Sequence, residues 1–120
     1  MNEGPVITGE EEDATVLSLH AKLFKFENTK DWKEKGTGNL RLNMNKQTNK
    51  YRLIMRTDGT MKLILNMLLF PKMSTKKQND KSLVITGLDE TGQLGNFLIR
   101  VGKTDTINAL LEKIEYGKNS

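Results

Sequence analysis

Residues 51–66 read YRLIMRTDGTMKLILN, and this stretch decides the fold of the chain. Its first six residues alternate with the two-residue period of a β-strand. One face of that strand carries Tyr51, Leu53 and Met55, and the other carries Arg52, Ile54 and Arg56. The Asp-Gly pair at 58–59 follows, and glycine accepts the positive φ of a tight hairpin turn without steric cost. The apolar run that begins at Met61 is therefore expected to pair back on 51–56 as a second antiparallel strand.

Short alternating segments, separated by turn residues, lie on both sides of this hairpin and indicate antiparallel β structure. In 39–43, for example, Leu40 and Leu42 share one face and Arg41 lies on the other. Further strands are expected at 20–27, 39–43, 82–88 and 96–102. Polar loops are expected at 28–38, which contains Trp32, at 45–49 and at 74–81.

The hydrophobic period changes near the C-terminus. The apolar stripe there has the i, i+3, i+4, i+7 spacing of an amphipathic helix and consists of Ile107, Leu110, Leu111 and Ile114. Thr104 or Asp105 is expected to cap the start of this helix, and Gly117 suits its end. A helix with one apolar face must cover something, and the open end of a β-sandwich is the natural surface. The expected fold is mainly β: a PH-like seven-stranded antiparallel sandwich or barrel capped by one C-terminal α-helix.

The length and composition exclude several classes of protein. A chain of 120 residues fits one domain, which at this size forms a core without covalent cross-links. The absence of cysteine excludes disulfide scaffolds, thiol catalysis and cysteine-bound zinc. The longest apolar run, 61–70, is about half the length of a membrane span. No basic segment followed by an apolar one begins the chain, so we expect no signal peptide.

The charges are distributed unevenly along the chain. Residues 1–13 carry five acids and no base, whereas the rest of the chain carries nineteen bases and ten acids. A basic body suits an anionic partner such as nucleic acid, lipid headgroups or an acidic peptide. The acidic arm that precedes it argues against the first two unless it is held away. A solubilising tail on a basic domain is the simpler interpretation of the same charges.

No arrangement of residues in the sequence indicates an enzyme, a metal site or a cofactor. His20 is the only histidine, and no patterned nucleophile or orienting carboxylate accompanies it. The carboxylates at 10–13 are consecutive, so they point in several directions and cannot form a defined metal cage. The tripeptide GKT at 102–104 lacks the glycine spacing of a phosphate-binding loop. The sequence therefore favours binding over catalysis.

Two features are candidates for a binding surface. Trp32, the only tryptophan, lies among charged residues and either folds back onto the sheet edge or serves as an exposed anchor. Arg52 and Arg56 share a strand face, and the hairpin is expected to place Lys62 near Arg52 or Arg56. These cations are either an ordinary solvated face or a surface that attracts an acidic peptide.

Four segments occur in order along the chain: GEEEDATVLSLHAKLFKFE, DWKEKGTGNLRLN, YRLIMRTDGTMKLILN and KSLVITGLDETG. Together they resemble a Ran-binding domain over about residues 6–114. The resemblance implies a PH-like sandwich that binds the GTP form of the small GTPase Ran. Within the family, the segments VITGEE, LRLN, MRTDG and LILN most resemble the sequences of the subgroup of Ran-binding protein 3 and its yeast counterparts.

The resemblance also implies how the two proteins would contact each other. The acidic arm would reach a basic patch on Ran, Ran's acidic C-terminal tail would lie against the basic face of the domain, and the WKEKG loop would lie at the interface. The arm is expected at 1–13, the domain at 14–116 and a tail at 117–120. The expected Ran-binding residues are Glu10, Glu11, Glu12, Asp13, Trp32, Lys33, Lys35, Arg52, Arg56, Lys62 and Asn66.

The subgroup implies a nuclear cofactor of exportin-mediated transport. Soluble cytoplasmic Ran-binding proteins usually have a second arginine at the position of Thr57 and a tryptophan-containing strand at 83–85. Their absence predicts modest affinity for Ran alone and reliance on an exportin with its cargo. We expect a monomer in the nucleoplasm or at the nuclear pore, with neither nucleic acid nor membrane as partner. The alternatives are a nuclear-basket nucleoporin, a soluble Ran-binding protein, and a PH-type binder of anionic lipid or peptide.

Overall fold

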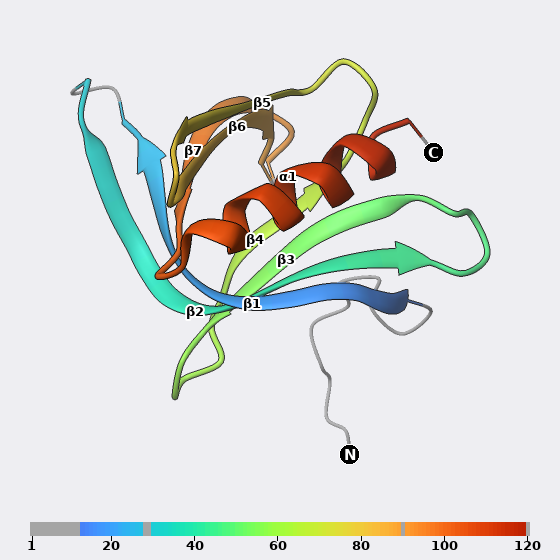
Figure 1. Cartoon of the computed structure of the whole chain (residues 1–120), viewed down its shortest axis with the longest axis horizontal. Coiled ribbons are helices and arrows are strands. Elements are labelled where there is room, and N and C mark those ends of the chain that lie inside the picture. The colour runs from blue at the N-terminus through green and yellow to red at the C-terminus, as the bar shows by residue number, and fades with distance from the viewer. Residues whose placement is uncertain (1–12, 28–29, 90, 120) are drawn as a thin grey trace.

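The computed structural model describes residues 13–27, 30–89 and 91–119. These residues form seven β-strands followed by one helix (Figure 1). The elements are β1 (Asp13–Phe26), β2 (Trp32–Asn45), β3 (Tyr51–Thr57), β4 (Leu63–Leu68), β5 (Ser74–Asn79), β6 (Ser82–Leu88), β7 (Leu94–Arg100) and α1 (Thr104–Gly117).

The strands form one antiparallel sheet in the order β4-β3-β2-β1-β7-β6-β5. β1 belongs to both halves of this sheet, because it pairs with β2 along its length while residues 22–25 also pair with β7. β1 and β2 curve strongly, and α1 lies across the open side of the bent sheet (Figure 1). The sandwich closed by a C-terminal helix, as expected from the sequence, is confirmed.

The core lies between the two halves of the sheet and beneath the helix. Leu53 of β3 and Ile99 of β7 are fully buried there. The helix contributes Ile107, Leu110 and Ile114, three of the four residues in the predicted stripe. Full burial of one such side chain contributes about 1.5–3 kcal/mol, so the stripe alone accounts for a large part of the attachment of the helix.

The β3–β4 hairpin forms as predicted around the Asp-Gly pair. Gly59 has a φ of 77°, the left-handed conformation that glycine adopts without strain. The turn is closed by the Thr57 amide, which donates to the Lys62 carbonyl at 2.9 Å, and by the Met61 amide, which donates to the Thr57 carbonyl at 3.0 Å. β4 begins at Leu63, two residues later than expected, because Met61 also has a positive φ.

Three strand predictions are wrong, each for a local reason. The expected loop at 74–81 contains β5, an edge strand whose side chains are almost all exposed, so no apolar alternation marks it. The expected loop at 28–38 ends early, because β2 begins at Trp32 and its first charged residues point into solvent. β1 begins at Asp13 and not at residue 20, because a bulge between Thr15 and Leu17 interrupts the alternation.

The helix ends also differ from the sequence-based expectation. Lys103 occupies the N-cap position and makes no side-chain cap hydrogen bond, so neither Thr104 nor Asp105 caps the helix. Gly117 is the last helical residue, and the reason for glycine there is packing: a Cβ would lie 2.8 Å from Cγ of Tyr51. Within the described residues, no helix is long and apolar enough to cross a membrane.

Candidate protein-binding surface

The face of β2 and β3 that points away from the core carries a pocket of about 380 Å³. We call it the outer-face pocket. Its lining comes from two adjacent strands and the hairpin turn and comprises Asn39, Arg41, Ile54, Arg56, Thr57, Asp58 and Met61. Ile54 is 1% exposed although it does not belong to the main core cluster, so it is buried on the outer side of the sheet. The pocket therefore combines an apolar floor with a polar rim.

Strand register places the two arginines of the pocket at neighbouring positions. Arg41 of β2 pairs with Ile54 of β3, and Arg56 of β3 pairs with Asn39 of β2. Since directly opposed and diagonal residues on one face lie within reach of long side chains, both guanidinium groups border the same space. Guanidinium groups recognise carboxylates through paired hydrogen bonds. The arrangement suits an acidic segment that also offers an aliphatic side chain.

The hairpin turn supplies the remaining wall of the outer-face pocket. Met61 is 62% exposed and presents an adaptable apolar side chain at the rim. Asp58 introduces a carboxylate, which lies 2.7 Å from Nε2 of His20. His20 thus has a polar contact with the hairpin turn on the sheet surface.

Three of the predicted site residues either line the outer-face pocket or neighbour a residue that lines it. Arg56 lines it, exposed Lys62 follows Met61 in the turn, and half-buried Asn66 pairs with Ile54 across the β3–β4 ladder. Sequence reasoning missed Arg41 as a site residue, although its face in the strand was predicted correctly. The β2–β3 register, which no local pattern contains, was the missing information.

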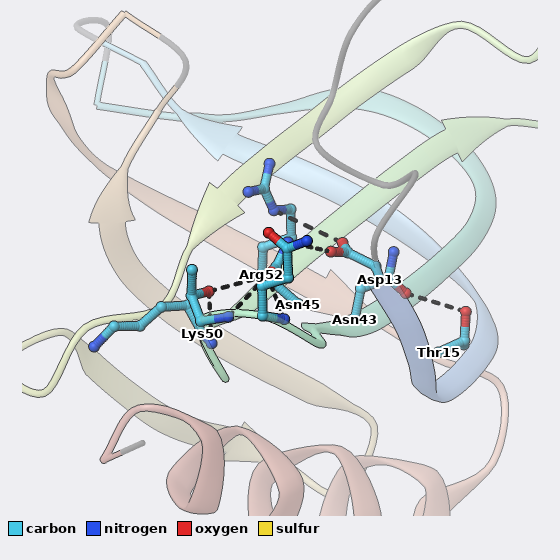
Figure 2. A network of polar contacts seen from close by, with 8 residues as sticks. Asp13, Thr15, Asn43, Asn45, Lys50 and Arg52 are labelled. Atoms are coloured by element: carbon cyan, nitrogen blue, oxygen red, sulfur yellow. Dashed lines mark hydrogen bonds and ion pairs between the residues drawn. The ribbon is translucent and has the colours of Figure 1, made fainter.

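Arg52 lies further along the same face and has a structural partner. Its Nε lies 3.9 Å from Oδ2 of Asp13, and the two side chains are 24% and 2% exposed (Figure 2). Asn45 donates to the other carboxylate oxygen of Asp13 at 3.4 Å, and Thr15 donates to Asn43 at 3.2 Å. Asp13 is therefore held within the sheet, not extended toward solvent. The other predicted acidic residues, Glu10, Glu11 and Glu12, lie outside the described residues.

Trp32 lies at the other end of β2, at the β1–β2 hairpin. Its ring packs edge-to-face on Phe26, with centroids 5.2 Å apart and an interplanar angle of 70°. Trp32 is half-buried and Phe26 is 40% exposed, so the tryptophan rests on the sheet and still presents part of its surface. Lys33 and Lys35 are exposed beside it, and Lys35 lies 3.8 Å from Glu27.

The aromatic pair and the outer-face pocket are separate surfaces. Eight residues of β2 lie between Trp32 and Arg41, so the two positions are roughly 30 Å apart along the strand. The predicted site residues therefore do not form one cluster: they occupy the hairpin tip, the outer face and the start of β1. A partner that contacts all of them has to extend along the domain.

The β6–β7 turn braces the hairpin end of β1. Asp89 lies 3.3 Å from Lys25, and it accepts hydrogen bonds from the amides of Thr91 and Gln93 at 2.9 and 3.0 Å. The hydroxyl of Thr91 together with these amides and Lys25 lowers the pKa of Asp89 to about 2, against the opposing effect of burial. The turn thus anchors the side chain of Lys25, which precedes Phe26 in β1. In the part of the chain that the structure describes, no group of acidic, histidine or cysteine side chains could hold a metal ion.

These features define the class of the chain as a PH-like domain with exposed cationic and aromatic surfaces. The family model described as the RanBP1 domain matches residues 5–120, and the chain belongs to this family of Ran-binding domains. It is 43% identical over 107 residues to human Ran-binding protein 3 (Homo sapiens), covering 84% of this chain and 19% of that protein. It is 32% identical over 113 residues to Ran-specific GTPase-activating protein 2 of Saccharomyces cerevisiae, covering 88% of this chain and 35% of that protein.

Solved structures support the fold independently. The Ran-binding domain of Nup2 from Ashbya gossypii matches with a TM-score of 0.79 and 23% identity, covering 91% of this chain and 97% of that one. The EVH1 domain of DCP1, solved with a peptide of XRN1, matches with a TM-score of 0.68 and 8% identity, covering 88% of this chain and 77% of that one. Both comparisons confirm the PH-like architecture. The chain spans about a fifth of the length of the Ran-binding protein 3 relatives that it matches.

Proposed function

We propose that this domain binds the GTP form of Ran and acts as a nuclear cofactor of exportin-mediated transport. The observation that carries the proposal is the match to the RanBP1 domain over residues 5–120, together with 43% identity to Ran-binding protein 3. The outer-face pocket gives the proposal a physical basis, because its two guanidinium groups and apolar floor suit an acidic, partly aliphatic tail.

The separation of the surfaces fits a partner that wraps around the domain. Ran's acidic tail would lie over Arg41, Arg56 and Lys62, where complementary charge speeds association. The exposed part of Trp32, with Lys33 and Lys35, would contact the body of Ran at the far end of β2. The acidic residues before β1 would reach a basic patch on Ran. Asp13 would serve mainly to hold the start of β1, because it contacts Arg52 of the same chain.

The proposal includes modest affinity for Ran in the absence of exportin. Thr57 lines the outer-face pocket where a further arginine would add a third guanidinium group. One fewer charge-assisted contact in such a pocket weakens binding by about 1.5–3 kcal/mol. An exportin that contacts both proteins would supply the missing free energy, and the domain would act in the nucleus, where such complexes assemble.

The test is a titration of the domain against Ran loaded with a non-hydrolysable GTP analogue and, separately, with GDP. Each titration is repeated with an exportin and a leucine-rich export peptide present. We expect selective but weak binding to the GTP form, which tightens when the exportin and peptide are added. Tight binding without exportin would overturn the cofactor part of the proposal and favour a soluble, cytoplasmic-type Ran-binding protein. Equal binding to both nucleotide forms, or none, would overturn it altogether.

A further inference from the structure

The sheet ends at β5, a strand with one unpaired edge. Among the residues that the structure describes, β5 pairs with β6 alone, from Ser74 opposite Thr86 to Asn79 opposite Ser82. Alternate peptide groups of an edge strand point away from the sheet and are available to another strand. Nearly all of its side chains are exposed, and Thr75 alone among them is half-buried.

The surroundings of the β5 edge are strongly basic. Between residues 72 and 81 the chain has one carboxylate, Asp80, which is 77% exposed and lies 3.6 Å from Lys77. The four lysines of this segment are Lys72, Lys76, Lys77 and Lys81. Lysines on an edge strand disfavour pairing with a second copy, because two such edges would bring like charges together. The same positive charges favour pairing with a strand that carries negatively charged side chains.

The helix forms a wall beside this edge. Lys77 donates to Asn108 at 3.0 Å, and Thr75 donates to Glu115, so one face of α1 follows β5. Leu111 lies between Asn108 and Glu115 on that face of the helix, since residues three and four apart share a side. Leu111 is half-buried and packs on the edge of the core. A side chain that entered between β5 and α1 would therefore meet an aliphatic surface flanked by Glu115.

We propose that the edge of β5 binds an extended peptide of alternating acidic and apolar residues as an eighth strand of the sheet. Because side chains of a strand alternate between its two faces, such a peptide presents its apolar residues to Leu111 and its carboxylates to Lys76 on the other face. Main-chain hydrogen bonds to β5 provide affinity, and the alternation provides selectivity. β5 contributes no residue to the lining of the outer-face pocket and ends the sheet on the other side of β1 from β2 and β3, so the site is distinct from that pocket (Figure 1).

The test uses the ¹⁵N-labelled domain and an acetylated heptapeptide of alternating glutamate and valine, with the corresponding lysine–valine peptide as the charge control. We expect amide shifts centred on β5, and exchange of its outward amides slowed about tenfold at saturation. The Lys76→Glu/Lys81→Glu variant should bind about tenfold more weakly, because it reverses charges beside the edge without touching the contacts of Thr75 and Lys77 with the helix. Arg41→Glu, in the outer-face pocket, is the matched control and should bind the peptide like the parent.

Three outcomes would overturn the proposal. The first is equal binding of the lysine peptide, and the second is no binding of either peptide. The third is a set of amide shifts centred on Arg41 and Arg56, which would place the acidic peptide in the outer-face pocket. Titration of the Lys76→Glu/Lys81→Glu variant with Ran-GTP separates this proposal from the proposed function, because we expect its affinity for Ran to be unchanged.

Discussion

The carboxylate of Asp13 in β1 lies 3.9 Å from Nε of Arg52 in β3, with β2 between the two strands, and the Asp13 side chain is 2% exposed. Its Oδ2 accepts no hydrogen bond from the residues that the structure describes. A buried carboxylate depends on its cationic partner, and removal of one member of such a pair is far more costly than removal of both. The main role of Arg52 in this domain is therefore structural: it provides the cation for the buried carboxylate of Asp13.

Replacement of Arg52 by methionine should lower the free energy of unfolding by about 3 kcal/mol, because it leaves Asp13 buried without its cation. Arg41→Met, on the exposed part of the same face, should change it by less than about 0.5 kcal/mol. Urea denaturation of both variants measures the difference. The Asp13→Asn/Arg52→Met double variant should recover most of the loss. Equal stability of the two single variants would contradict the structural role of Arg52.

Gly117→Ala should destabilise the domain by about 1 kcal/mol. Alanine is favoured over glycine in a helix by about 1 kcal/mol, but forced overpacking costs about 1–3 kcal/mol. Here the added Cβ would lie 2.8 Å from Cγ of Tyr51, close to the backbone of β3, where little movement is available. Gly102→Ala is the control, since a Cβ there meets nothing within 4 Å. A thermal melt in which Gly117→Ala is more stable than the parent domain would show that the end of the helix can shift to accommodate the added Cβ.

Local pattern was sufficient to predict the elements that contain a clear apolar period. The helix stripe from Ile107 to Ile114 and the hairpin around Gly59 form as expected, because each depends on residues close in sequence. β5 could not be found in this way. Its residues are polar on both faces, and only its pairing with β6 makes it a strand.

The same distinction applies to the candidate site. Arg56 was a candidate because its face of β3 could be read from the alternation around Ile54. Arg41 joined it in the pocket only through the pairing of β2 with β3, which depends on contacts between segments distant in sequence. Asp13 was expected in a solvent-exposed arm, and its burial depends on Arg52, which lies two strands away in the sheet.

The brace at Asp89 should make stability depend on pH in the acidic range. The pKa of Asp89 is about 2 in the fold and 3.8 ordinarily, so the fold favours its charged form. This contribution is present above about pH 4 and is lost as the pH falls toward 2. Asp89→Asn should therefore lower the melting temperature at pH 7 and bring the parent and the variant together near pH 2. A constant difference between the two across this range would contradict the titration of Asp89.

Trp32→Ala should act on the dissociation of Ran-GTP, whereas charge reversal in the outer-face pocket should act on association. The exposed part of the indole makes short-range contacts, which form only after docking, and a hot-spot residue of this kind contributes about 2 kcal/mol, or about a 30-fold faster dissociation. Arg41→Glu should instead slow association and flatten its salt dependence, because long-range attraction steers the encounter. Stopped-flow measurements at two salt concentrations separate the rates. Trp32→Phe keeps an aromatic ring against Phe26 and is the control for the fold. Association and dissociation rates of Trp32→Ala that both equal those of the parent would show that the hairpin does not contact Ran.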